Sequence, residues 1–376
     1  MRDLQEIRQD IDRVDGDLVK LFQERMELCR EVAEYKIDAK KRVLDPKREA
    51  EKLEKVMALA DSEFNRQCVG ELFTQLIAMS RKMQYKMLAE HGLSSGFGFS
   101  EVKELKRDGI VVVYQGVEGA YSHQAMLQYF GDKTENFHVK TFRDAMEAIR
   151  DGKADYAVLP IENSSAGSVY DVYDLLLEFD NCIVAESFVK VEHALLGLKD
   201  ATLNDITTVH SHPQGLMQCS RFLEQHREWQ SISELNTAGS ARKVLEAGDK
   251  SHAAIASELT GELYGLKVLE KGIHYNKENT TRFLIISKEK IYTEQAKKVS
   301  ISFELPHTSG TLYNMISHFI FNHLNMTKIE SRPIEGRNWE YRFIIDVEGR
   351  ICDAEMENAL LGIEGEAKSF RILGNY

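Results

Sequence analysis

Three short polar runs in the middle of the chain contain residue types that can do hydrogen-bonding or proton-transfer chemistry. They are Leu159–Val169, Ser211–Gln214 and Asn279–Phe283, and each follows or joins an apolar stretch typical of a strand. Open α/β sheets bind ligands at strand ends, so hydroxyls and amides gathered there can orient a substrate or polarise a leaving group. Asn, Ser and Gly are also ordinary turn residues. Three such runs in one segment favour a functional site over three plain loops.

A second group of polar residues lies in the first ninety residues, where cations share a helix face. Arg25 and Lys36 are eleven residues apart, which places them about 20° apart around a helix. Arg8 precedes Arg25 by seventeen residues and is about 100° away, so it fits a partner chain's pocket better than its own. Two i,i+4 pairs follow, Asp45 with Glu49 and Ser80 with Gln84. From spacing alone, a solvated face of ion pairs is the better explanation of this pattern.

Residues 1–90 resemble the all-helical chorismate mutase family, which gives this cationic face a chemistry. Chorismate has two carboxylates and an ether oxygen, and its rearrangement to prephenate needs no acid, base or cofactor. The protein must bind the compact conformer and stabilise charge on the breaking ether. The resemblance implies that Arg25 and the partner's Arg8 hold carboxylates with support from Ser80. It also implies that Lys36 and Gln84 donate hydrogen bonds to the ether oxygen. The ring hydroxyl is then bound by Glu49 together with the backbone near Asp45.

The middle segment, roughly residues 110–286, resembles prephenate dehydratase. The matching motifs occur in that family's order: Gly116–Ser122, Glu162-Asn-Ser, Ser211-His-Pro-Gln, Asn236-Thr-Ala and Thr281-Arg-Phe283. The resemblance implies conversion of prephenate to phenylpyruvate with loss of water and carbon dioxide. Thr281 is then the candidate donor to the departing hydroxyl.

Further residues of the middle segment have supporting or undecided roles. The resemblance assigns a supporting hydrogen-bond network to Asn163, Ser211 and Gln218. Glu162 adjoins this network, and Arg282 is either a ligand of a substrate carboxylate or a structural residue. His210 and His212 are not expected to take part in the chemistry, because a lone loop histidine is more often a surface or capping residue.

The last eighty residues resemble the small amino-acid-binding regulatory domain called ACT. Glu330, Ser331, Arg332 and Pro333 match its ESRP motif at a predicted strand end. The resemblance implies feedback inhibition by L-phenylalanine, bound where two such domains meet. A second candidate effector-binding run is Gly310, Thr311 and Leu312, where the family usually has Gly-Ala-Leu, and the threonine leaves the affinity open.

Hydrophobic periodicity predicts the elements that position these residues. Helices are expected over 4–36, 45–60 and 64–89, and the first is too long to be covered by its own segment, which favours a homodimer. A linker at 91–109 precedes an α/β domain at 110–287. This domain is expected to have two lobes, as in periplasmic binding proteins, a largely parallel sheet, and a strand at 282–286 that returns to the first lobe. After a charged linker, residues 299–376 show a βαββαβ order, which predicts an α+β, ferredoxin-like domain.

Composition excludes several other classes of protein. The net charge of −12 argues against nucleic acid as a partner, and no apolar run is long enough to cross a membrane. The charged start lacks a signal core, which predicts a cytoplasmic protein. Five scattered cysteines form no CxxC pair, so neither a metal site nor a disulfide framework is expected. No cofactor is expected either.

Other functions remain possible at this point. A solute-binding protein would share the two lobes but leave the mutase-like residues unexplained. A mutase fused to a dehydrogenase would need a dinucleotide fingerprint, and Gly116–Gly119 has the wrong spacing for one. A chorismate mutase whose middle and C-terminal regions only sense an amino acid is a further alternative. The sequence does not separate prephenate from arogenate as the substrate, nor set the oligomer beyond a dimer.

Overall fold

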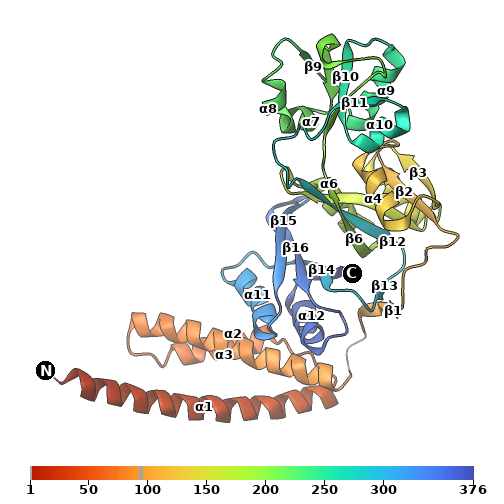
Figure 1. Cartoon of the computed structure of the whole chain (residues 1–376). Helices are drawn as coiled ribbons and strands as arrows, with labels where there is room; N and C mark the ends of the chain where they lie inside the picture. The colour runs from red at the N-terminus through yellow and green to blue at the C-terminus, as the bar shows by residue number, and fades with distance from the viewer. Residues whose placement is uncertain (1, 93–95) are drawn as a thin grey trace. The chain divides into compact units, whose positions relative to one another are not determined.

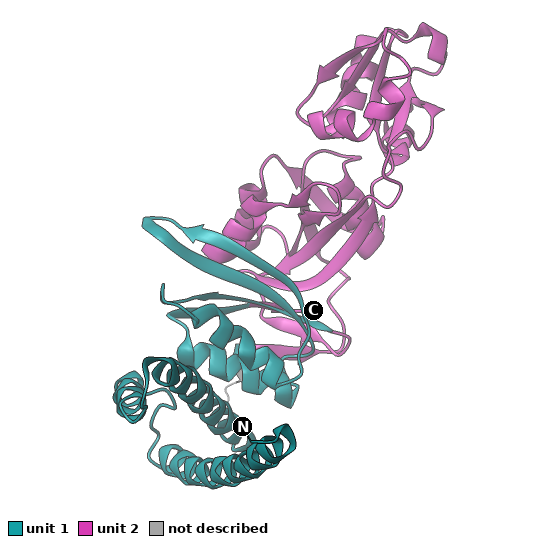
Figure 2. Ribbon diagram, turned by 90° about the vertical axis from the view of Figure 1, so that its left-hand side faces the viewer, with its two compact units in different colours: residues 1–98, 297–372 teal, residues 99–296, 373–376 magenta. Residues whose placement is uncertain are grey.

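The computed structural model describes residues 2–92 and 96–376. The chain divides into two compact units, each assembled from separate stretches of sequence (Figure 2). Unit 1 contains residues 1–98 and 297–372, whereas unit 2 contains residues 99–296 and 373–376.

The N-terminal part of unit 1 consists of three helices, close to the predicted positions (Figure 1). They are α1 (Leu4–Asp38), α2 (Pro46–Met57) and α3 (Glu63–Glu90). Helix α2 begins where the sequence places a cap and a proline, since the Asp45 side chain accepts a hydrogen bond from the Arg48 backbone N–H. Ser62 caps α3 in the same way.

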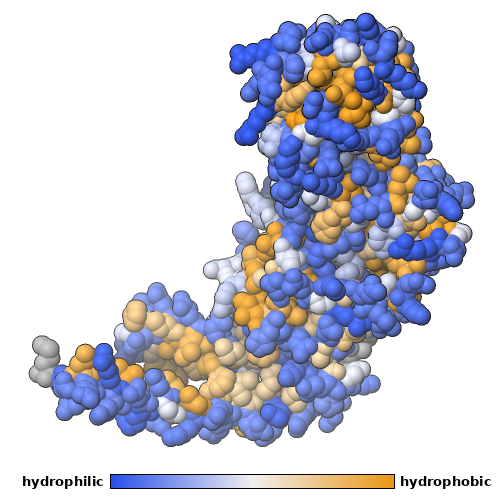
Figure 3. Space-filling view, in the orientation of Figure 1, coloured by the Kyte–Doolittle hydropathy of each residue, from blue (hydrophilic) through white to orange (hydrophobic). Residues whose placement is uncertain are grey.

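Helix α1 keeps most of its apolar side chains at the surface. Ala33 is the one buried residue within Leu4–Asp38. Exposed apolar side chains recur along the helix, and orange patches mark apolar residues on this face of the molecule in Figure 3. The stripe comprises Leu4, Ile7, Ile11, Val14, Leu18, Leu21, Leu28 and Val32. Nothing within residues 2–92 and 96–376 covers a stripe of this length.

The C-terminal part of unit 1 has the predicted βαββαβ order. Its elements are β14 (Lys298–Glu304), α11 (Thr311–Phe321), β15 (Met326–Ile334), β16 (Arg337–Glu348), α12 (Ala354–Glu366) and β17 (Ser369–Asn375). The strands run in the sheet order β15-β16-β14-β17, which is the ferredoxin-like arrangement. Strand β17 ends in unit 2, where Gly374 pairs with Ile183.

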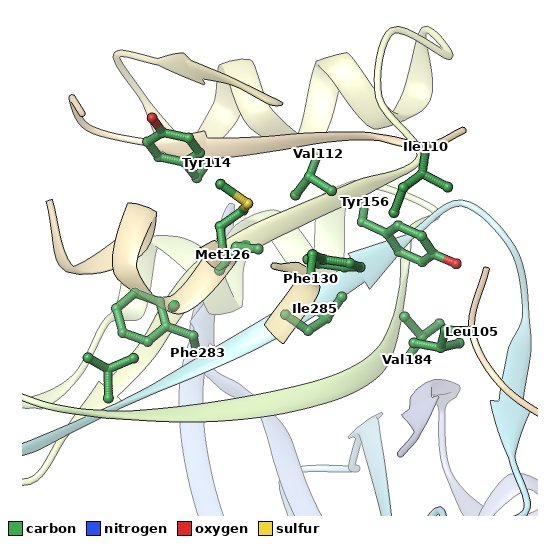
Figure 4. Close-up of a cluster of buried hydrophobic side chains, with 13 residues drawn as sticks. Leu105, Ile110, Val112, Tyr114, Met126, Phe130, Tyr156, Val184, Phe283 and Ile285 are labelled. Carbon is green, nitrogen blue, oxygen red and sulfur yellow. The ribbon is translucent and has the colours of Figure 1, made fainter. Parts of the chain in front are cut away.

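The first lobe of unit 2 is a sheet covered by helices. Its strands, in sheet order, are β6 (Cys182–Lys190), β12 (Thr280–Ser287), β4 (Tyr156–Asn163), β2 (Val111–Gln115) and β3 (Glu135–Val139). The helices are α4 (Tyr121–Phe130), α5 (Phe142–Arg150) and α6 (Tyr170–Glu178). Side chains from β12 and α4 share one core, in which Phe283 and Ile285 lie near Met126 and Phe130 (Figure 4).

The second lobe of unit 2 has its own sheet and core. Its strands, in sheet order, are β11 (Lys267–Glu270), β7 (Ala194–Gly197), β10 (His252–Ala256), β8 (Thr208–Ser211) and β9 (Gln230–Ser233). Its helices are α7 (Pro213–Gln218), α8 (Ser220–Leu223), α9 (Thr237–Ala247) and α10 (Glu258–Tyr264). Two stretches join the lobes, residues 191–193 and 271–279.

The expectation of a largely parallel sheet is wrong, because both sheets are mixed. Strand β12 runs antiparallel to both β4 and β6, and β7 runs antiparallel to β10 and β11. The reason is that the chain passes from the first lobe to the second and then returns. The returning strand, β12, enters the sheet of the first lobe in the opposite direction to its neighbours. The predicted return of strand 282–286 to the first lobe is confirmed by its pairing with β4.

Two candidate active sites and a candidate effector groove

The helical part of unit 1 brings together several of the predicted mutase residues. Arg25 of α1 donates to the Ser80 hydroxyl of α3 at 2.6 Å, and also to the Leu76 carbonyl at 3.2 Å. Ser80 is buried, and its hydroxyl donates a hydrogen bond to that carbonyl at 2.7 Å. The guanidinium is therefore held at a fixed place between two helices, with part of its surface open.

Lys36 completes the cationic side of this site. Its ammonium donates to the Val43 carbonyl at 2.6 Å, which fixes the chain between α1 and α2. Burial lowers the pKa of Lys36, although the nearby carboxylates of Asp45 and Glu49 act in the opposite direction. Asp45 itself is exposed and is used as the cap of α2.

Glu49 forms an ion pair with a residue that the sequence analysis missed. Arg81 of α3 donates to the Glu49 carboxylate at 2.6 Å, and its side chain is only 9% exposed. Burial raises the pKa of Glu49, and Arg81 opposes that change. Arg81 could have been found in the sequence, because it is a third cation that directly follows Ser80 and precedes Gln84 by about one helical turn.

Gln84 has an unsatisfied polar atom inside the site, whereas Arg8 lies outside it. Gln84 is buried, and its side-chain oxygen has no hydrogen-bond partner among the described residues. An unsatisfied buried polar atom is costly, so such an atom often marks a binding site. Arg8 is exposed near the start of α1. The structure therefore brings Arg25, Lys36, Glu49, Ser80 and Gln84 together and leaves Arg8 available to another chain.

In the first lobe of unit 2, Asn163 and Thr281 are paired across neighbouring strands. The Asn163 amide nitrogen donates to the Thr281 hydroxyl oxygen at 2.9 Å and to the Asn279 side-chain oxygen at 2.8 Å. The Asn163 oxygen accepts from the backbone N–H groups of Ser165 and Ala166, both at 2.9 Å. These two bonds fix which end of the amide faces Thr281.

Asn279 is a second residue that the candidate list lacked, although it begins one of the three polar runs. It is 1% exposed, and its amide nitrogen has no partner among the described residues. A donor that is buried and unsatisfied beside Thr281 suits an acceptor on a bound molecule. The cluster Asn163–Asn279–Thr281 therefore presents one hydroxyl and one amide donor at the strand ends.

Arg282 and Glu162 do not join this cluster. Successive side chains of a strand point to opposite faces, and Arg282 is the register partner of Glu162 rather than of Asn163. The Arg282 guanidinium is bound by the Glu186 carboxylate at 2.7 Å and by the Tyr376 hydroxyl at 2.8 Å. We therefore favour a structural role for Arg282 over the carboxylate-binding one.

Ser211 and Gln218 lie in the second lobe. Ser211 is fully buried, and its hydroxyl donates to the Ile255 carbonyl at 2.9 Å. This bond holds the end of β8 against the neighbouring strand β10. The Gln218 side-chain oxygen lies 2.8 Å from His193 Nε2, and the other ring nitrogen lies 3.1 Å from the Tyr121 hydroxyl. Burial lowers the pKa of His193 to about 4, so this imidazole is neutral at pH 7. Tyr121 and Gln218 thus connect the two lobes through His193.

The C-terminal part of unit 1 contains a groove of about 320 Å³ at the start of α11. Thr311 and Leu312 of the predicted effector site line it, together with residues of the preceding loop and of β16. Gly310 is the N-cap of α11, and the Thr311 hydroxyl donates to the backbone of that loop. The other four predicted residues, Glu330, Ser331, Arg332 and Pro333, lie on β15 and are not part of the groove lining.

Other features of the described residues point to no additional chemistry. No cluster of His, Cys, Asp or Glu in the ranges 2–92 and 96–376 has the arrangement of a metal site. None of the described helices is both long enough and apolar enough to cross a membrane. His210 lies between Glu234 and His252, hydrogen-bonded to both.

Comparison with known proteins places both sites in families. Residues 7–85 match the model for chorismate mutase type II, and residues 112–291 match the model for prephenate dehydratase. A bifunctional chorismate mutase/prephenate dehydratase of Escherichia coli K12 is 32% identical over 98% of this chain and 95% of its own length.

Two solved structures cover 71% of this chain, each with a TM-score of 0.66. One is a prephenate dehydratase from Arthrobacter aurescens in complex with L-Phe, 29% identical over 89% of that chain. The other is described as GqqA, a novel type of quorum quenching acylase, 34% identical over 97% of that chain. With an enzyme domain matched on each side of residue 98 and a full-length relative above 30% identity, this chain belongs to the bifunctional chorismate mutase/prephenate dehydratase family.

Proposed function

We propose that the two sites act in succession in phenylalanine biosynthesis, converting chorismate to prephenate and then prephenate to phenylpyruvate. The observation that carries this proposal is the coincidence of geometry and family match. Arg25 and Ser80 bond to each other inside the mutase match, and Asn163 and Thr281 bond to each other inside the dehydratase match. Each reaction therefore has its own set of residues.

In the mutase site, the protein's task is to hold a dianion in its reactive shape. The Arg25 guanidinium, fixed by Ser80, binds one carboxylate as a planar fork, and Arg8 of a second copy binds the other. The Lys36 ammonium and the Gln84 amide donate to the ether oxygen as its bond to carbon lengthens. Because these donors are fixed before the reaction, charge that develops on the oxygen is stabilised without reorganisation. The Glu49 carboxylate accepts a hydrogen bond from the ring hydroxyl of the substrate.

In the dehydratase site, hydrogen-bond direction assigns the donor. Asn163 donates to the Thr281 oxygen, so the threonine proton is directed elsewhere, toward the ring hydroxyl of prephenate. As the ring carboxylate leaves as carbon dioxide, the electrons of its C–C bond enter the ring and expel the hydroxyl, which takes up a proton from solvent and leaves as water. Thr281 needs only to polarise this oxygen, because aromatisation provides the driving force. The unsatisfied Asn279 amide is a second donor to the substrate.

We further propose that residues 299–376 form an ACT domain that binds L-phenylalanine. The groove at Thr311 and Leu312 supports this proposal, and a helix start offers backbone N–H donors to a carboxylate. Because Glu330–Pro333 lies outside that groove, the motif of a second copy is needed to complete the pocket. The exposed stripe on α1 supports a homodimer too. The proposed functional domains are 1–90, 110–287 and 299–376, in a cytoplasmic enzyme without a cofactor.

A coupled assay tests the proposal. Purified protein is given chorismate, and prephenate and phenylpyruvate are followed over time. Prephenate is then supplied directly, with arogenate in parallel. Phenylpyruvate formed from both chorismate and prephenate is the expected result. Mutase activity with no turnover of prephenate or arogenate would instead favour the alternative in which the middle and C-terminal regions only sense an amino acid.

A further inference from the structure

We propose that Arg81 is a positioning residue of the chorismate mutase site, and that Glu366 of the C-terminal βαββαβ segment is its second anchor. The mutase reaction would then depend on helix α12, far away in the sequence. This inference rests on the proposed role of Glu49 as the acceptor of the ring hydroxyl. It adds a residue that contacts Glu49 and not the substrate.

One guanidinium binds two carboxylates. Arg81 Nη1 donates to Glu49 at 2.6 Å, while Nε and Nη2 donate to the two oxygens of Glu366 at 2.7 and 3.1 Å. The side chains of Arg81 and Glu366 are each 9% exposed. A guanidinium is planar and rigid, so the two-bond contact with Glu366 sets the direction in which Nη1 points. The position of the Glu49 carboxylate is therefore determined in part by Glu366.

Helix α12, which ends at Glu366, is packed closely against α3 and α11. A Cβ atom at Gly365 would lie 2.3 Å from the Tyr85 hydroxyl of α3, and one at Gly362 would lie 2.3 Å from the His318 ring of α11. His318 Nε2 lies 3.2 Å from the Glu366 carboxylate. Glycine at both positions lets the three helices approach within contact distance. Movement of α11 or α12 would therefore reach Arg81.

The charges around Glu49 give the arrangement a measurable signature. Glu49 accepts a hydrogen bond well only when ionised, so mutase activity should fall as the pH drops through its pKa. Burial raises this pKa, Arg81 lowers it and Glu366 raises it. The ionisable groups that face the two carboxylates come from four helices. Those facing Glu49 are Lys36, Arg81 and Glu366. Those facing Glu366 are Arg81, Lys82, Tyr85 and His318.

Four variants of the full-length protein test the inference through the pH dependence of mutase kcat. In Glu366→Gln, the Arg81 charge is balanced by Glu49 alone, so the acid limb should move down by about one pH unit. In Arg81→Met, Glu49 loses its cation, so the limb should move up and kcat should fall ~10–100-fold. Arg81→Lys keeps the charge and loses the fork, so kcat should fall with little shift of the limb. Glu364→Gln removes an exposed charge from the same helix and should match the wild type.

Dehydratase turnover on supplied prephenate, with circular dichroism, reports whether each variant is folded. If Arg81→Met does not fold, Glu366→Gln and Arg81→Lys still decide the question. A loss of kcat in Glu366→Gln without a shift of its acid limb would show that Glu366 is merely structural and would overturn the inference, as would wild-type behaviour. Glu49→Gln separates the two proposals. If it keeps wild-type mutase turnover, the role of Glu49 is wrong; if it is inactive while the Arg81 and Glu366 variants behave as wild type, only this inference fails.

Discussion

The direction of a single hydrogen bond supports the role that we propose for Thr281. Because the Asn163 amide is fixed by two backbone donors, its nitrogen must face the threonine oxygen. Thr281→Val keeps the shape of the side chain and removes the donor, so dehydratase kcat should fall by about 10²–10⁴. Thr281→Ser should retain much of the activity. Steady-state kinetics on prephenate measure both variants.

The adjacent Thr280 provides the matched control for this prediction. Its hydroxyl donates to the Glu278 carbonyl rather than joining the Asn163 cluster. Thr280→Val should therefore keep near wild-type turnover. Equal losses at both positions would mean that a threonine is needed for the strand and not for the reaction.

Lys36 should set the alkaline limit of the mutase. Burial lowers its pKa from the ordinary 10.5, and only the ammonium form carries the charge that stabilises the developing negative charge on the ether oxygen. Activity is therefore present below this pKa and is lost as the pH rises through it. Lys36→Arg, which keeps its charge to higher pH, should move the alkaline limb upward, whatever its effect on kcat.

Two measurements check this prediction. The pH profile of mutase kcat/KM should differ between wild type and Lys36→Arg on the alkaline side alone. Lys36→Ala should abolish mutase activity and leave turnover of supplied prephenate nearly intact. An identical alkaline limb in wild type and Lys36→Arg would assign that limb to another group.

At the scale of elements, helix α1 presents a residue that its own chain does not use. Arg8 is exposed, and so is the apolar stripe beside it. If two copies pair along α1, Arg8 of one completes the site of the other. Mixing Arg8→Ala protein with Lys36→Ala protein should then restore part of the mutase activity, because one of the two sites in a mixed dimer has all its residues. Subunit exchange is followed by native mass spectrometry, and exchange without recovered activity would contradict a shared site.

Periodicity and motifs predicted most elements, since local patterns determine them. The three N-terminal helices and the βαββαβ order agree with the sequence because caps, prolines and apolar spacing act within a few residues. Strand direction was not predicted correctly, because β12 pairs with strands about ninety residues or more earlier in the chain. Arg81 was missed for the same reason, since its partner Glu366 is 285 residues away. Asn279 was visible in its polar run, and only the unsatisfied amide identified it.

At the scale of the whole molecule, regulation should pass from the groove to the dehydratase. L-Phenylalanine should inhibit prephenate turnover through a coupling of about 1–3 kcal/mol, equal to a 5–150-fold change in affinity. Leu312→Ala shortens a side chain that lines the groove, so it should weaken inhibition and leave uninhibited kcat unchanged. Ile320→Ala, an exposed position on the same helix, is the control. Titration calorimetry that shows unaltered phenylalanine affinity in Leu312→Ala would place the effector elsewhere.

Point variants are preferable to removal of the C-terminal domain in that experiment. Residues 373–376 belong to unit 2, where Tyr376 binds Arg282 and Gly374 pairs with β6. A truncation at residue 299 would therefore damage the dehydratase itself, and lost activity would say nothing about regulation.

The interleaving of the two units also affects how the protein is made. Helix α3 needs α12 to cover Arg81 and Tyr85, yet residues 99–296 are synthesised between the two parts of unit 1. At roughly 5–20 residues per second, the N-terminal helices wait on the order of 15–55 s until α12 has been synthesised. During that delay the apolar stripe of α1 is exposed on nascent chains, where neighbouring ribosomes on one message can bring two stripes together. If two copies pair along α1 as we propose, that pairing can begin before either chain has finished folding.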